Sequence, residues 1–163
     1  MDLQSEMHQM RQEQNMIFLN EEQEERNVMD KTNETVKKLN TILKAICKDF
    51  IDGDQKLLNT KQTSDSSPGF SLIDSEVPDY RALSFSVTSK CESSHVEIMI
   101  SDQKWRQVSN FIGNWGNWSD QETIYTGVLD ESVIRKKLEG AFLSWYQRVL
   151  QRREAVLHDK SFS

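Results

Sequence analysis

The chain has 163 residues, of which 36% are hydrophobic and 28% are charged, and its formal net charge is −6 at pH 7. This length leaves room for one compact domain and an extension. The excess of negative charge argues against a protein that binds nucleic acid mainly through the phosphate backbone. The two cysteines form neither a CxxC pair nor a disulfide framework, which favours a reducing compartment.

The opening residues show no basic stretch followed by an apolar core, so the sequence predicts no signal peptide. The longest apolar run, residues 16–19, is far shorter than the roughly 20 residues that span a bilayer. We therefore expect a soluble, intracellular protein of the cytoplasm or nucleus, with no membrane partner.

Residues 1–59 contain no proline and a single glycine, Gly53, and their apolar residues recur at steps of three and four. This spacing predicts a helical coiled-coil arm over residues 1–59 that joins copies of the chain into a homo-oligomer, with a dimer favoured. Two alternatives remain: the helix packs back on its own domain, or it meets a helix of another protein. The expected oligomer interface consists of Met29, Val36, Leu39, Leu43, Ile46 and Phe50.

A second, weaker apolar register lies upstream, at Leu3, Met7, Met10 and Ile17. The acidic residues 21–25 separate the two registers. Either one helix runs through with a discontinuity in its repeat, or Asn20 caps a new helix with an acidic first turn.

Residues 60–79 are rich in Ser, Asp and Thr and hold both prolines, which predicts a linker. Its apolar patch, Phe70, Leu72 and Ile73, is expected to dock on the domain as a short strand. Residues 80–163 are predicted to form a small α+β domain. The overall fold class is then α+β, with a long N-terminal helix, a short antiparallel sheet and a long C-terminal helix.

Within the domain, alternating apolar residues predict strands near residues 83–88 and 96–100, joined by a hairpin loop. Residues 101–113 are predicted to form a short helix, and residues 123–129 a third strand. Asp130 is a good N-cap for the last helix, whose wide apolar arc can cover the sheet on one side and face a second subunit on the other.

Trp115 and Trp118 stand in the segment NWGNWS, which is predicted to be a loop. Because tryptophan is common at recognition hot spots, both are candidate partner-binding residues. The alternatives are that the indoles close over the small core, or that they stack on single-stranded nucleic acid.

No pattern in the sequence indicates a catalytic, metal-binding or phosphate-binding site. Cys91 and His95 lack the third orienting group that a nucleophile pair requires, the histidines have no zinc-ligand spacing, and no phosphate-binding glycine motif occurs. We therefore expect a non-enzymatic protein with no cofactor and no metal.

These observations predict an oligomeric interaction or adaptor protein, in which the coil associates chains and the C-terminal domain binds another protein. One alternative is a nucleic-acid-associated protein that uses the basic last helix and the tryptophan segment; nucleic acid is the less favoured partner. The other alternative is a small acidic chaperone or inhibitor of one client protein.

Overall fold

The computed structural model describes residues 2–61, 67–78, 82–107 and 115–158. The described elements are α1 (Leu3–Gly53), β1 (Leu57–Lys61), β2 (Phe70–Asp74), β3 (Ser84–Glu92), β4 (His95–Gln107), β5 (Trp115–Val128) and α2 (Glu131–His158). The strands form one sheet in the order β1-β2-β3-β4-β5, and each strand pairs antiparallel with the next. The α+β class, with a long helix at each end of the sheet segment, is confirmed.

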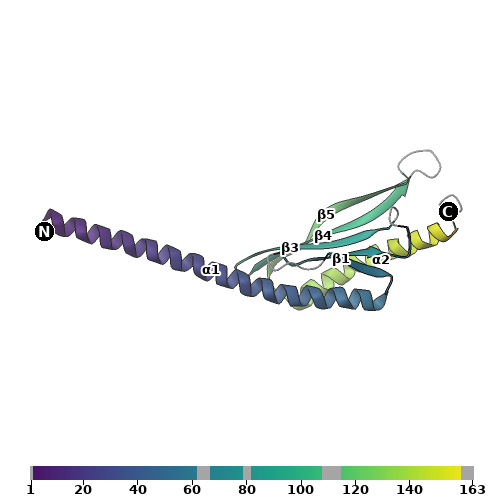
Figure 1. Ribbon diagram of the computed structural model, residues 1–163, viewed down its shortest axis with the longest axis horizontal. Helices are drawn as coiled ribbons and strands as arrows, with labels where there is room; N and C mark the ends of the chain where they lie inside the picture. Colours follow the sequence, from purple (N-terminus) through teal and green to yellow (C-terminus); the bar gives the residue numbers. More distant parts are fainter. Residues whose placement is uncertain (1, 62–66, 79–81, 108–114, 159–163) are drawn as a thin grey trace.

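Both helices cover the same face of the sheet (Figure 1), α1 against β1, β2 and β3, and α2 against β4 and β5. The strands alternate accordingly: Phe85 and Val87 of β3 are buried under the helices, whereas Ser84 and Ser86 beside them point to the other face. On the open face, the hydroxyls of Ser71 and Ser86 are hydrogen-bonded to each other between β2 and β3 at 2.9 Å.

The second half of α1 is part of this core, which corrects the predicted oligomer interface. Leu39, Leu43, Ile46 and Phe50 are buried in one cluster with residues of the chain's own sheet and of α2, and Val36 is buried as well. A helix with apolar residues at steps of three and four can pack on a sheet as well as on a partner helix. Here the stripe packs on the apolar face of the chain's own sheet. Met29 is the exception, because it lies before the sheet begins and is 66% exposed.

The helix α1 is continuous from Leu3 to Gly53, so Asn20 is an interior residue and caps no second helix. The boundary between its free and packed parts is set by the turn between β3 and β4. Ser93 has a positive φ of 52° there; its N–H donates to Thr32 Oγ1, and its carbonyl accepts from Thr35 Oγ1, both at 2.7 Å. The two threonines therefore fix a strained turn to the helix.

The predicted helix over residues 101–113 is wrong where the structure describes it, and residues 108–114 lie outside the described part. Residues 101–107 instead continue β4 and pair with residues 115–121 of β5. The expected order of helix, strand, strand, helix, strand, helix is therefore also wrong. Cross-strand pairing holds residues 101–107 in the sheet, and local propensity does not capture such long-range pairing.

The segment predicted as a linker contributes to the sheet. Phe70 to Asp74 form β2, as expected for its apolar patch, between β1 and β3. Gly69 precedes β2 where a Cβ atom would lie 2.3 Å from the Val87 carbonyl oxygen, so only glycine lets the backbone approach β3 this closely.

An ion network ties the two helices to β2. Arg153 of α2 donates to Asp74 through Nε at 3.1 Å and Nη2 at 2.7 Å, and to Asp54 through Nη1 at 2.7 Å. Tyr146 also donates to Asp54. Burial alone would raise the pKa of Asp54, but the hydrogen bonds from Arg153 and Tyr146 outweigh it and hold that pKa below its usual value.

Packing predicts different outcomes for two residues of the predicted interface. Ile46→Ala removes methyl groups from a fully buried site and should lower the free energy of unfolding by about 2–5 kcal/mol. Met29→Ala, at an exposed site, should change it by less than about 0.5 kcal/mol. Urea unfolding followed by circular dichroism at low protein concentration measures both, and equal losses would contradict this assignment of the core.

Among substitutions that remove a charged side chain, we expect Arg153→Met to be the most destabilising. It leaves Asp74, whose side chain is 1% exposed, without its cation, and a buried pair broken on one side typically costs about 3–5 kcal/mol. Arg26→Met breaks an exposed pair with Glu22 and is the matched control, with an expected loss of at most about 1 kcal/mol. Similar urea midpoints for the two variants would show that the network is not structural.

Candidate interaction surfaces

The first half of α1 is a free helical arm, which we define as residues 3–31. It projects from the end of the sheet (Figure 1), and every residue in it is exposed except Glu22, which is half-exposed. Its length is about 44 Å at 1.5 Å per residue. The upstream register lies here, and its apolar members are exposed: Leu3, Met7, Met10, Ile17 and, further on, Val28.

The arm is also acidic in its second half. Glu21, Glu22, Glu24 and Glu25 follow the apolar register, and Glu21 and Glu24 occupy positions that continue its steps of four and three. A helix seam on this side is therefore apolar over residues 3–17 and charged beyond them. A surface that contacts the whole arm must therefore accommodate apolar side chains at residues 3–17 and carboxylates at residues 21–25.

The outer side of α2 carries a second exposed apolar row. The inner side is core, with Ile134, Leu138, Trp145 and Val149 fully buried. On the outer side Leu143, Leu150 and Leu157 follow one another at intervals of seven and are 64%, 49% and 75% exposed. The wide apolar arc in the sequence pointed to this second face, and the spacing of the leucines was its signal.

A groove of about 380 Å³ lies between α1 and α2. Its apolar wall contains Phe50 and Phe142, whose rings stack with centroids 3.9 Å apart, together with Leu143 and Tyr146. Carboxylates of Asp49, Asp54 and Glu139 stand around it. Asp49 is bound to Arg135 at 2.7 Å and Asp54 to Arg153, so much of this negative charge is already compensated inside the chain.

The predicted partner-binding residues Trp115 and Trp118 lie on β5 rather than in a loop. Their backbones pair with Gln107 and Lys104 of β4, at the far end of the β4–β5 hairpin. Their side chains lie outside the described part of the chain, so their partner-binding role stays a prediction. In Figure 1 this end of the hairpin stands away from α2.

Several cations of the last helix are engaged in contacts within the chain. Arg135 binds Asp49, Arg148 binds Asp102 of β4, and Arg153 binds Asp54 and Asp74. These pairs leave less positive charge on α2 for an external polyanion than the sequence count suggests.

The cysteines are poor nucleophiles where they stand. Burial raises the pKa of Cys47 to about 11 and also raises the pKa of Cys91. Both thiols are therefore protonated at neutral pH. They are poor nucleophiles because the thiolate is the reactive species. Among the described residues, no group of three or more His, Cys, Asp or Glu side chains could hold a metal ion.

Comparison with protein-family models, with curated proteins and with solved structures returned no match. Within the described part of the chain, neither helix is long and apolar enough to cross a membrane.

The state of Cys47 can be checked by alkylation with iodoacetamide at pH 7.5, followed by mass spectrometry of the peptides. A rise of two units in its pKa lowers the thiolate fraction about 100-fold, so the folded chain should react at least that much more slowly than the chain in urea. Reaction of Cys47 at the same rate in both conditions would show that its thiol is neither buried nor perturbed.

Proposed function

We propose that this protein is a non-enzymatic, oligomeric interaction protein whose arm pairs with the arm of a second copy. Its head, by which we mean the sheet with the packed half of α1 and with α2, would bind another protein. The observation that carries the proposal is the free arm: 29 consecutive helical residues that bury nothing of their own and present an apolar row. We place the interface on the row formed by Leu3, Met7, Met10 and Ile17 instead, because Val36, Leu39, Leu43, Ile46 and Phe50 are buried in the head.

Helix energetics support a partner for the arm. A helix in water gains little from its own hydrogen bonds, and most helical stability in proteins comes from burying an apolar face. The arm's apolar residues are spaced by four, three and seven, which is the spacing of a two-stranded seam with one polar position at Gln14. A second copy supplies the same row, so no further sequence is needed to complete the seam.

The head would be the part that contacts a different protein. We place this contact on the projecting β4–β5 hairpin with Trp115 and Trp118, because aromatic residues dominate binding energy at protein interfaces. Two heads joined through their arms would engage a target together, and the second contact would then be intramolecular. This raises the apparent affinity without any new contact.

Self-association through the arm is tested by sedimentation equilibrium of the full chain at tens of micromolar. Met10→Asp combined with Ile17→Asp puts two carboxylates into the seam between arms. We expect the dissociation constant of this contact between arms to rise at least about 100-fold, because unpaired charges are costly to bury. Gln12→Asp with Asn15→Asp adds the same charge on the opposite side of the helix and is the matched control. If both double variants sediment like the parent chain, the arm does not join two copies.

A further inference from the structure

We propose that α2 is a second self-association surface, which pairs antiparallel with α2 of another copy along its outer side. This surface is separate from the arm and does not depend on the arm's proposed function. Its core is the apolar row Val133, Leu143, Leu150 and Leu157, all exposed. Because the inner side of α2 already fills the core of its own chain, these four side chains are left largely exposed.

The remaining positions of the row complete a heptad pattern. Lys136, Gly140, Gln147 and Glu154 are exposed and alternate with the apolar residues at steps of three and four. In heptad terms, one series of positions runs Val133, Gly140, Gln147, Glu154. The other series runs Lys136, Leu143, Leu150, Leu157.

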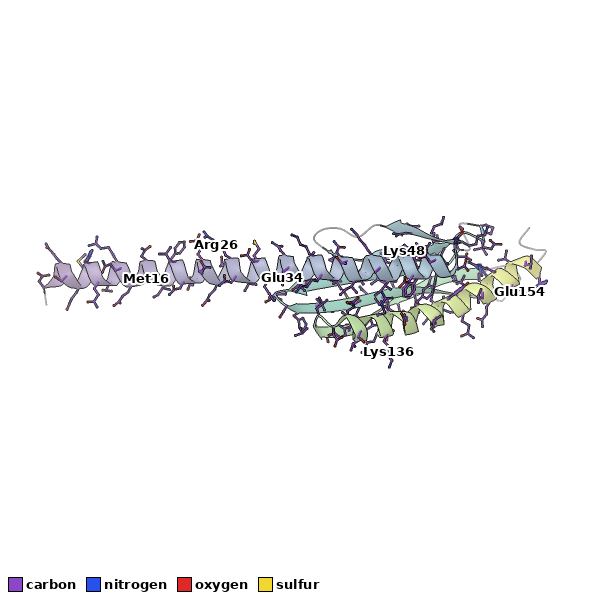
Figure 2. All side chains as sticks on the ribbon, turned by 90° about the horizontal axis from the view of Figure 1, so that it is seen from below. Met16, Arg26, Glu34, Lys48, Lys136 and Glu154 are labelled. Carbon is purple, nitrogen blue, oxygen red and sulfur yellow. The ribbon has the colours of Figure 1, made fainter. Side chains whose placement is uncertain are left out.

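An antiparallel arrangement matches these two series layer by layer. Aligning the helices so that paired residue numbers add to 290 puts Val133 opposite Leu157 of the second copy, and Lys136 opposite Glu154. The two-fold axis repeats each pair, so the dimer holds two apolar contacts and two ion pairs at its ends. Figure 2 shows Lys136 and Glu154 toward opposite ends of α2. At 1.5 Å per residue, the 18 positions between them correspond to about 27 Å along the helix axis.

The central layers of the same alignment are matched in size. Gly140 falls opposite Leu150 of the second copy, and Leu143 falls opposite Gln147. A Cβ atom at Gly140 would meet nothing within 4 Å, so the fold of the chain itself does not call for glycine there. Glycine inside a helix nevertheless costs about 1 kcal/mol relative to alanine. A leucine from a second helix that fills the space over Gly140 accounts for this residue.

A parallel pair is disfavoured by charge and by packing. In register it would place Lys136 against Lys136, Glu154 against Glu154, and Gly140 against Gly140. The first two contacts repel, and the third leaves a gap in the seam. The antiparallel register replaces the two repulsions with attractions and fills the gap with leucine.

The helix is ready for this contact before it meets a partner. Its inner side is locked by buried Trp145, Val149 and Leu138, so pairing requires no ordering of the backbone. The row from Val133 to Leu157 is about 36 Å long, which is more than three heptads. The Glu154 carboxylate lies 2.7 Å from His158 Nε2, in an exposed contact that a stronger cation can displace.

The test uses the full chain carrying Met10→Asp and Ile17→Asp, so that the arm does not contribute, and measures mass by sedimentation equilibrium. In this background the chain should still dimerise. Lys136→Glu should raise the dissociation constant about tenfold or more, because two attractions per dimer become repulsions, and Glu154→Lys should do the same.

Two further samples should recover the original dissociation constant: the double variant K136E/E154K, and an equimolar mixture of the two single variants. Lys37→Glu, an equal charge change on the exposed side of α1, is the control and should leave the dissociation constant unchanged. Circular dichroism confirms that each variant is folded, as expected for exposed sites.

Each remaining outcome overturns the proposal. A monomeric mass in the arm-variant background at tens of micromolar would show that α2 does not associate. A dimer unaffected by either single charge reversal would show a parallel pair or another surface. Arm pairing is tested separately. It predicts that Met10→Asp combined with Ile17→Asp changes the mass of a chain that carries no substitution in α2.

Discussion

The structure depends on the contact between the second half of α1 and the apolar face of the sheet. A five-stranded antiparallel sheet with one apolar face is not stable in water unless that face is covered. The need is greater here because a small domain buries little apolar surface in total. Leu39, Leu43 and Ile46 are fully buried there, each contributing roughly 1.5–3 kcal/mol by transfer from water. The part of α1 that was expected to join two chains therefore stabilises the fold of its own chain.

The second helix completes the same layer and links the ends of the others. Phe142 stacks on Phe50 of α1, and Arg153 joins Asp54 after α1 to Asp74 at the end of β2. This network joins residues that are 79 and 99 positions apart in the chain. Because breaking a buried ion pair on one side is costly, the network specifies how the helices end against the sheet.

With the core satisfied, the unpartnered apolar surface is concentrated on the arm and on the outer side of α2. Each is a row with helical spacing, on a helix that has already formed or runs on from a packed one. Large exposed apolar rows are uncommon on monomers and usually mark association sites. Two separate self-association rows on one chain would allow assemblies larger than a dimer, because each copy could contact two others.

The sequence by itself determined the helical character of the N-terminal third and of the last helix, the strands near residues 83–88 and 96–100, and the α+β class. These follow from the local spacing of apolar residues and from caps such as Asp130, whose Oδ1 accepts from the Val133 N–H at 3.2 Å. It also marked Phe70–Ile73 as a strand. It could not decide what each apolar face packs against, because a sheet and a partner helix select the same spacing. Only the tertiary structure decided that Val36–Phe50 belong to the core, that residues 101–107 pair with β5 instead of forming a helix, and that Leu143, Leu150 and Leu157 remain uncovered. The reason in each case is physical: burial and strand pairing are long-range contacts, and local patterns carry no information about them.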